Sequence, residues 1–369
     1  MESSNQNVVL LVLGSQSWQA WISDFVAPTN SLSAVISCPA DYEALVATVA
    51  QVKPSTVIFL SHHLTLNRDA GWARDLEREL HLPVICQSSV AIELAYDKRL
   101  MAQLASRSPH VSPIPELTAQ AARSLIQSGD CGVVMKKSSG TEGDGFAVAH
   151  DLSDLDDILS AHQESSGNWM LQPHIQGREV SVNLWRMGRS THVLEAVEKG
   201  VTSMDGKHPC KRVRHCPAPP LTTTELQALN EAAAEIAVAA EIQGIAELEF
   251  ILSEDRIYLL EINPRISATL RMNLLACQVN FTRLIELSGD QSEDRTVFVN
   301  ASRFSAEFAL PDTASGFKYA GKLSEGIWAT TRVTMVANSL VELDSKAAVA
   351  RAIIGLSNSN TAPLFNGIE

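Results

Sequence analysis

The 369-residue sequence lacks the marks of a membrane-bound, secreted or nucleic-acid-binding protein. No apolar run approaches the length of a membrane span, and no basic residue precedes the short apolar run near the start, so we expect no signal peptide. The six cysteines form no C-x-x-C pair, which favours reduced thiols and a cytoplasmic location. The net charge of −13 argues against nucleic acid and anionic membranes as partners, because phosphate groups need a cationic surface.

What is present indicates a globular protein of two or three domains, with 45% apolar and 19% charged residues. The apolar runs NVVLLVLG, SAVISC, STVIFLS and LPVICQS follow one another at intervals of roughly 25 residues, with helical patterns between them. Continuous apolar strands that alternate with helices are typical of a buried parallel sheet. We therefore predict a parallel α/β domain over residues 1–95.

The pattern changes after a proline-rich stretch near residue 110. Strands, a glycine-rich turn and helices then mix, which predicts an α+β region over residues 96–300 with its own subdomain at about 110–178. Residues 301–369 read as strands followed by a closing helix. The fold class predicted for the whole chain is thus α/β combined with α+β.

Acidic side chains interrupt the hairpin ELEFILSEDRIYLLEINPRIS, residues 247–267. Glu261 and Asn263 are two apart and share one face, with Leu259 expected beside them. If the strands fold over EDR as a three-residue loop, Glu249 lies opposite Glu261, with the two carboxylates about 5 Å apart. Such a pair needs either a retained proton or a bound cation, and an all-oxygen set suits Mg²⁺. The alternative is a solvated strand face whose glutamates point at lysines.

A second pattern is VVMKKSSGTEGDGF, a strand that ends in lysine and leads into a glycine-rich loop. Backbone N–H groups of such a loop can approach phosphate closely. The loop lacks the P-loop spacing, and a strand rather than a helix follows it. An ordinary hairpin turn is the alternative for this segment taken alone.

Together, and in this order, these motifs resemble the ATP-grasp superfamily over roughly residues 1–300. The resemblance implies an N-terminal parallel α/β domain, a central two-subdomain ATP-binding region and a small C-terminal closing segment. It also implies ATP and Mg²⁺ as cofactors, with Mn²⁺ as an alternative metal. Lys137 and Gln172 depart from the family, which usually has proline and glutamate there. The implied site residues are Lys98 and Lys136 at the phosphates, Ser139, Gly140, Gly143 and Gly145 in the flap, Gln172 and Ile175 at the adenine, Glu179 at the ribose, Glu249, Glu261 and Asn263 as metal ligands, and Arg265 at the acyl-phosphate step.

The branch of the superfamily is less defined. EINPRIS resembles both the carbamoyl-phosphate synthetase and biotin carboxylase group and the amino-acid ligases. KRVRHCPAP resembles the carboxylases and would place Lys211 near the substrate, with a solvated loop cation as the alternative. Thr269, however, stands where carboxylases carry a glutamate base. We therefore favour a free-standing carboxylate–amine ligase, with bicarbonate activation or a non-catalytic nucleotide-binding protein as alternatives.

The expected partners are a small carboxylate and an amine, with neither nucleic acid nor membrane, and a homodimer is left open. Three further polar residues, His62, His63 and Arg271, could lie near the site. His62 and His63 follow a predicted strand and are expected to serve packing or to lie on the surface. Arg271 could grip a substrate carboxylate, but we favour a surface cation on a helix.

Overall fold

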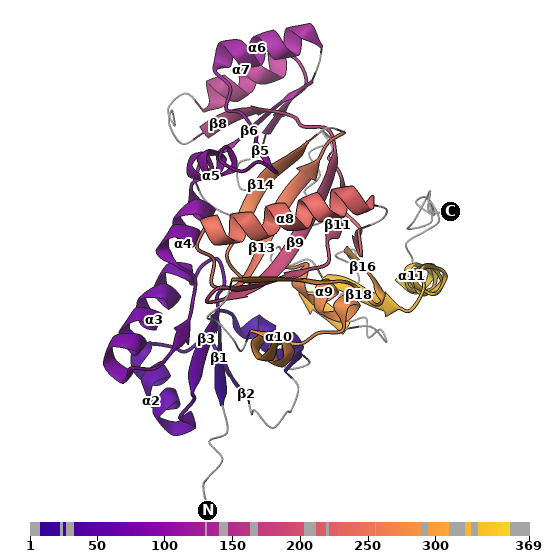
Figure 1. Cartoon of the computed structure of the whole chain (residues 1–369). Coiled ribbons are helices and arrows are strands. Elements are labelled where there is room, and N and C mark those ends of the chain that lie inside the picture. The colour runs from indigo at the N-terminus through magenta and orange to yellow at the C-terminus, as the bar shows by residue number, and fades with distance from the viewer. Residues whose placement is uncertain are drawn as a thin grey trace, which may run out of the picture.

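The computed structural model describes most of the chain (Figure 1). The described residues are 8–22, 25–26, 33–129, 131–139, 147–162, 169–202, 212–218, 221–254, 256–288, 294–309, 322–325 and 331–354. Within these ranges no helix is both long enough and apolar enough to cross a bilayer. The fold combines a parallel α/β sheet with two mixed or antiparallel α+β sheets, as the sequence predicts. The domain limits at residues 95 and 300 stay predictions.

The N-terminal sheet is fully parallel, with the strand order β2-β1-β3-β4. Its connections carry helices because parallel neighbours need a crossover. Its elements are β1 (Val9–Leu13), the one-turn η1 (Gln16–Trp18), α1 (Gln19–Ile22), β2 (Ser33–Ser37), α2 (Tyr42–Val52), β3 (Thr56–Leu60), α3 (Leu66–Leu80), β4 (Val84–Ile85) and α4 (Ser89–Tyr96).

The central strand β1 is buried along its whole length, which accounts for its unbroken apolar sequence. Leu10 and Val12 pack into the core formed with α2 and α3. Leu11 and Leu13 point to the other face of the sheet, where they join a core that includes Trp185 of the large sheet. The N-terminal sheet therefore shares a core with the rest of the chain.

Gly14 ends β1 at a point where the backbone of the next loop comes very close. A Cβ at this position would lie 2.3 Å from the His62 nitrogen and 2.6 Å from Thr65 Oγ1. We expect Gly14→Ala to lower the free energy of unfolding by about 1–3 kcal/mol, since the loop must move to accept the methyl group.

The matched control is Gly71→Ala on α3, where an added Cβ would meet nothing within 4 Å. Alanine should stabilise that helix by roughly 0.5–1 kcal/mol. Urea unfolding of both variants measures the contrast. Equal stability of the two variants would contradict the close approach at Gly14.

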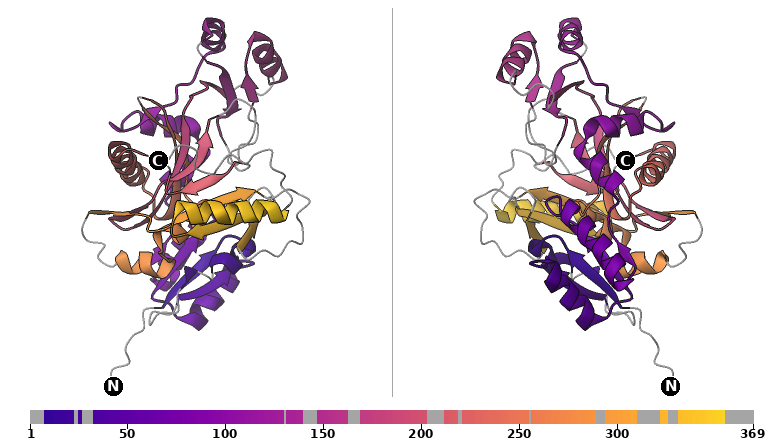
Figure 2. Two further views of the ribbon diagram at one scale, coloured as in Figure 1. Left: turned by 90° about the vertical axis from the view of Figure 1, so that its right-hand side faces the viewer. Right: turned by 90° about the vertical axis from the view of Figure 1, so that its left-hand side faces the viewer.

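A three-stranded antiparallel sheet forms the opposite end of the molecule from the N-terminal sheet (Figures 1 and 2). Two helices cover it, and its core includes Val133, Met135 and Leu155. Thr118 caps the first helix by accepting a hydrogen bond from the Ala121 nitrogen. The elements are α6 (Ala119–Ser128), β6 (Val133–Lys137), β7 (Ala147–Ala149), α7 (Leu152–Ala161) and β8 (Trp169–Pro173).

The large sheet lies between these two ends and has eleven strands among the described residues. Its main path runs β17-β18-β16-β12-β11-β9-β13-β14-β5, and β10 and β15 extend it beside β9. The strands are β5 (Ser112–Pro113), β9 (Arg178–Met187), β10 (Ser190–Leu194), β11 (Val197–Val201), β12 (Arg214–Cys216), β13 (Gly244–Leu252), β14 (Ile257–Asn263), β15 (Arg295–Val299), β16 (Phe304–Ala309), β17 (Lys322–Glu325) and β18 (Thr331–Ala337).

The two faces of the large sheet differ in character. Val180, Val182 and Leu184 of β9 point into an apolar core covered by α5 (Lys98–Ala105) and α8 (Thr223–Ala239). The intervening β9 residues face the other way and include the polar residues Ser181 and Asn183. On that side α9 (Leu270–Cys277) contacts β12, β16 and β18, and α10 (Phe281–Leu287) follows it. The last helix, α11 (Leu340–Ile354), packs on β16 and β18. The polar face is where the candidate site lies.

Candidate functional site

The β13–β14 hairpin places Glu249 directly opposite Glu261, as predicted. The route to this pairing differs from the prediction. Near the turn Leu252 pairs with Ile257, one residue tighter than a three-residue loop would give. A shift of register between Glu249 and Phe250 then restores the expected pairing.

The register shift corrects one prediction about the hairpin. Leu259 was expected on the same face as Glu261 and Asn263, but it is 1% exposed and lies in the core with Leu248 and Ile262. The shift leaves Leu260 without a cross-strand partner, which turns Leu259 to the apolar face. The two acids and the amide thus lie on the polar face without Leu259.

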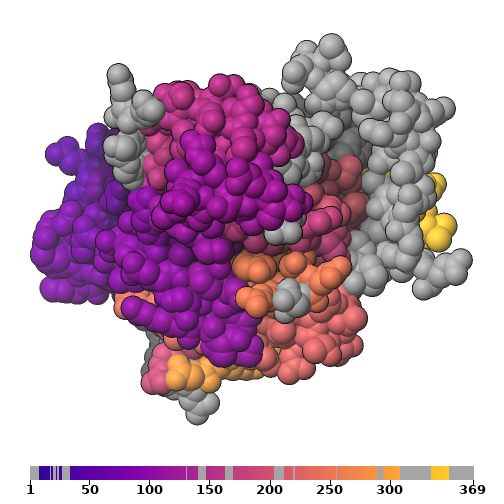
Figure 3. Space-filling model, turned by 90° about the horizontal axis from the view of Figure 1, so that it is seen from above, coloured from indigo at the N-terminus to yellow at the C-terminus, as the bar shows by residue number. Residues whose placement is uncertain are grey.

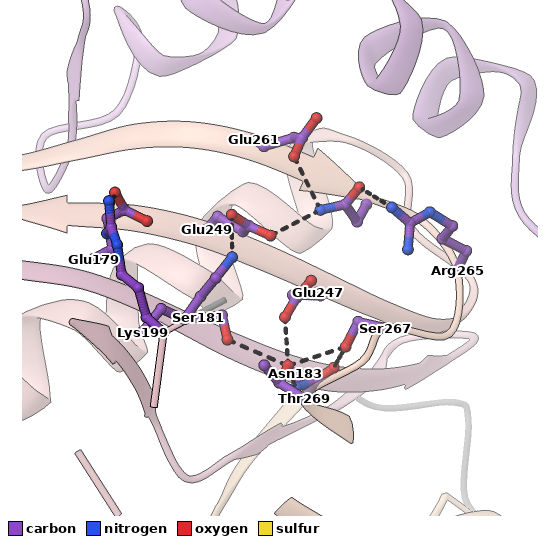
Figure 4. Close-up of polar contacts among 12 residues, drawn as sticks. Glu179, Ser181, Asn183, Lys199, Glu247, Glu249, Glu261, Arg265, Ser267 and Thr269 are labelled. Atoms are coloured by element: carbon purple, nitrogen blue, oxygen red, sulfur yellow. Dashed lines mark hydrogen bonds and ion pairs between the residues drawn. The ribbon is translucent and has the colours of Figure 1, made fainter. Parts of the chain in front are cut away.

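Figure 4 shows the two acids, Glu249 and Glu261, on neighbouring strands. The amide of Asn263 hydrogen-bonds both carboxylates. Its Nδ2 donates to Glu249 Oε1 at 3.3 Å and to Glu261 Oε2 at 3.4 Å. Its Oδ1 accepts from Arg265 Nη2 at 2.9 Å. Two facing carboxylates with an amide between them form the all-oxygen donor set that Mg²⁺ prefers once the amide turns its oxygen inward, so these residues fit a cation.

No trio of Asp, Glu, His or Cys side chains gathers closely enough to hold a metal in the described part of the chain. The predicted ligand set does not depend on such a trio, because it joins two carboxylates to an amide oxygen. Its role in metal binding stays a proposal.

Lys199 was missed by the sequence reasoning, yet it touches the hairpin directly. Its Nζ lies 2.5 Å from Glu249 Oε2, and both side chains are nearly buried. Burial alone would raise the pKa of Glu249, but the Lys199 ammonium and its hydrogen bond hold it below the usual value. The alternative in which glutamates point at lysines is therefore realised for Glu249, but on a buried face.

Glu247 is a third acid on the polar face, opposite Asn263, and it was not among the predicted site residues. It is 4% exposed and accepts a hydrogen bond from Thr269 Oγ1. Burial, and then the charge of Glu249, raise the pKa of Glu247. Thr269 also accepts from Asn183 Nδ2 at 2.9 Å, so this network ties the start of α9 to the sheet.

The predicted phosphate lysines lie on two elements, Lys98 on α5 and Lys136 on β6. Lys98 begins α5, and its backbone nitrogen donates to Ser138 at the end of β6 at 2.9 Å. Burial, and then the charge of Lys98, lower the pKa of Lys136 to about 8, against the opposing charge of Glu261. Lys136 therefore lies within electrostatic reach of Lys98 and of Glu261 on the hairpin. In the space-filling view, the orange surface of the hairpin lies beside the purple surface around α5 (Figure 3).

The flap is described only at its start. Ser139 is exposed and forms a bridge to Asp97, which links the end of β6 to the start of α5. Gly140, Gly143 and Gly145 lie outside the described residues, as does Lys211.

The predicted nucleoside contacts lie on β8, on β9 and on the segment between them. Gln172 on β8 donates through Nε2 to the Ile114 oxygen at 3.0 Å, so its side chain holds the preceding linker. Ile175 follows β8 and is half-buried. Glu179 on β9 accepts from Arg212 at 3.0 Å, while its buried Oε2 makes no hydrogen bond to a described residue. That oxygen could accept a ribose hydroxyl.

His62 and His63 follow β3 and lie close enough to Arg265 to be affected by its charge. His62 and His63 pack ring to ring at 3.8 Å, and Trp18 lies 5.1 Å from His62. Burial foremost, together with the Arg265 charge, lowers the pKa of each histidine to about 4. The packing interpretation fits both histidines, which stay neutral near pH 7.

The expectation that Arg271 is a surface cation is wrong. Arg271 is 3% exposed, and the first five residues of α9 are all buried. The helix has no solvent face there because Met272 packs with residues of β11 and β12, while Leu270 and Leu274 join the core shared with the N-terminal sheet. Helical periodicity alone could not show this.

Comparison with known proteins agrees with the fold. Residues 95–274 match the family described as carbamoyl-phosphate synthase L chain, ATP binding domain. The chain is 24% identical over 213 residues to a carbamoyl-phosphate synthase of Methanobrevibacter smithii, which covers 57% of this chain and 57% of that protein. The chain thus spans little more than half the length of that relative.

Two solved structures resemble nearly the whole chain. The L-amino acid ligase from Bacillus licheniformis has a TM-score of 0.63 and 15% identity, over 95% of this chain and 98% of that one. The biotin carboxylase domain of 2-oxoglutarate carboxylase from Hydrogenobacter thermophilus, described with MgADP and bicarbonate, has a TM-score of 0.64 and 14% identity, over 94% and 89%. The chain therefore has the ATP-grasp fold, and its residues 95–274 match the ATP-binding domain of the carbamoyl-phosphate synthase L chain.

Proposed function

We propose that the chain is an ATP- and Mg²⁺-dependent ligase. It would join a small carboxylic acid or amino acid to an amine through an acyl phosphate, with release of ADP and phosphate. The observation that carries this proposal is the facing pair Glu249 and Glu261, with Asn263 between them and Lys136 within electrostatic reach of Glu261.

The lysines and the nucleoside contacts would fix ATP in place. Lys98 and Lys136 offset phosphate charge, Glu179 Oε2 accepts a ribose hydroxyl, and backbone groups near Gln172 and Ile175 read the adenine edge. Mg²⁺ on Glu249, Glu261 and Asn263 would supply further neutralisation of the phosphates. Ser139 and the three flap glycines would cover the phosphates and exclude water.

Arg265 lies at the end of the hairpin, where the acid substrate would meet the γ-phosphate. A carboxylate oxygen attacks the γ-phosphorus and ADP leaves with the bond electrons. The amine nitrogen then attacks the acyl carbon, loses a proton, and expels phosphate. Arg265 would stabilise the oxyanion of the tetrahedral intermediate.

The ligase reading is supported by Thr269, which cannot act as the carboxylate base of a carboxylase. The likeness to the Bacillus licheniformis ligase over 98% of its chain also supports it. One observation favours the alternative of ATP-dependent carboxylation or carbamoyl-phosphate-type activation of bicarbonate. Glu247 hydrogen-bonds Thr269, so a carboxylate does lie beside that position.

Purified protein with Mg-ATP and a matrix of amino-acid pairs tests the proposal. We expect phosphate release that requires both the acid and the amine, and a product whose mass equals their sum less one water. ADP formation that depends on bicarbonate and needs no amine would establish the alternative instead. Absence of nucleotide turnover with either set would contradict both.

The setting proposed for this activity is the cytoplasm, with small molecules as partners and a homodimer as the assembly. None of the described cysteines, Cys38, Cys86, Cys131, Cys216 and Cys277, takes part in a disulfide, which fits a reducing compartment. Sedimentation velocity of the purified protein tests the dimer.

Lys136 should make ATP affinity depend on pH. With its pKa at about 8, the side chain is largely charged at pH 7 and largely neutral at pH 9. Bound phosphate favours the charged form, so affinity is full below the pKa and is lost above it. We expect the dissociation constant of a non-hydrolysable ATP analogue to rise by up to about tenfold between pH 7 and pH 9.

Isothermal titration across this range, in buffers of equal ionic strength, measures the effect. Lys136→Arg is the matched control, because a guanidinium stays charged throughout and should flatten the profile. A flat profile in the unaltered protein would mean that Lys136 does not contact the phosphates.

A further inference from the structure

Lys199 reaches the hairpin from a strand two places away. It lies on β11, β11 pairs with β9, and β9 pairs with β13. Ser181 of β9 pairs with both Val197 and Glu249, so the side chain of Lys199 crosses over β9 to meet Glu249 (Figure 4). The side chains of Lys199 and Glu249 are only 7% and 12% exposed, so this ion pair is built into the sheet.

The other acids near Lys199 already have partners. Glu247 accepts from Thr269, and Glu179 accepts from Arg212. Glu249 alone receives the ammonium within hydrogen-bond distance among the described residues. Its two oxygens are thus both engaged, Oε2 by Lys199 and Oε1 by Asn263, whereas the hydrogen bond seen for Glu261 among the described residues is the one from Asn263.

A pair of carboxylates at a phosphate-transfer site can hold two divalent cations, which together clamp the reacting oxygens. At this hairpin one of the two carboxylate charges is already compensated by a fixed ammonium. A second divalent cation on Glu249 would have to share its carboxylate with that ammonium, at close range in a buried setting where like charges repel strongly. The remaining charge is enough for one ion.

We infer that Lys199 takes the place of one of these two ions, so that the site holds a single divalent cation beside the bound nucleotide. This inference rests on the proposed function, since it concerns the metal that accompanies ATP. Lys199 is a positioning residue: it holds the Glu249 carboxylate in place through their ion pair, and it leaves Glu261 and the Asn263 amide as the principal ligands. The ammonium is present before nucleotide arrives, so the hairpin is partly organised in advance.

Counting bound Mn²⁺ tests the inference. The protein is saturated with AMP-PNP, a non-hydrolysable ATP analogue, and free Mn²⁺ is read from its electron paramagnetic resonance signal during titration. We expect one Mn²⁺ per bound nucleotide in the unaltered protein. Lys199→Met keeps the length of the side chain but removes its charge, and we expect it to raise the count to two.

Two control variants separate charge from folding. Lys199→Arg keeps the positive charge and should stay at one ion. The double variant Lys199→Met with Glu249→Gln removes both charges and should return the count to one. Circular dichroism and thermal melting establish that each variant is folded, and the count for the unaltered protein decides the question even where a variant is not.

Two bound ions of comparable affinity in the unaltered protein would overturn the inference and leave the proposed ligase intact. A folded Lys199→Met variant that still binds one ion would do the same. Failure of the unaltered protein to bind AMP-PNP with Mn²⁺ at all would instead overturn the proposed function together with the inference.

Discussion

Glu261→Gln is expected to lower ATP-dependent product formation by on the order of a thousandfold or more, since in the proposed site it removes a charged metal ligand at the phosphates. The fold should survive, because the amide has the size of the acid and the contact that Glu261 makes in the described structure is a 3.4 Å hydrogen bond from Asn263. The measurement is phosphate release under saturating Mg-ATP, with urea unfolding beside it.

Glu254→Gln is the matched control on the same hairpin. Glu254 lies exposed at the turn, so the same chemical change there should leave activity and stability unaltered. The hypothesis of a metal site on the hairpin would be lost if Glu261→Gln retained activity within tenfold of the unaltered enzyme.

Arg265→Lys is expected to lower kcat by about 10²–10³-fold while changing nucleotide affinity far less. The lysine keeps the charge but loses the forked donor geometry. Arg265 donates to Asn263 Oδ1 through Nη2 and to the Ile266 oxygen through Nη1, and an ammonium cannot make both contacts in the same way. Steady-state kinetics and titration with AMP-PNP separate the two effects.

Arg189→Lys is the control for this substitution. Its side chain is 59% exposed and is paired with Asp294 at the surface, so kcat should not change. If Arg265→Lys weakened nucleotide binding as much as it lowered kcat, the residue would serve ground-state binding rather than the acyl-transfer step.

The hairpin shows how far sequence pattern can predict this site. The predicted pairing of Glu249 with Glu261 is confirmed, although the turn itself is one residue tighter than predicted. The same reasoning put Leu259 on the wrong face, because a shift of one residue between pairs leaves no mark in hydrophobic periodicity. Two local irregularities, a tighter turn and a shift, compensated for each other.

The contacts that the sequence did not reveal are those between distant strands. Lys199 meets Glu249 across an intervening strand, and Glu247 meets Thr269 at the start of a helix. Neither contact follows from spacing within one element, because each depends on the order of strands in the sheet. The signal available for Lys199 was its position inside the strand VEKGV, since a buried cation requires an anion nearby.

Strand β1 of the N-terminal sheet packs against the segment that carries Arg265. Leu11 and Leu13 share one densely packed cluster with Ile266, the residue that follows Arg265. Close-packed interiors transmit strain rather than absorb it. A methyl group added or lost in β1 would therefore shift the backbone that carries Arg265. The N-terminal sheet thus helps to position the proposed reaction centre and does not pack independently of it.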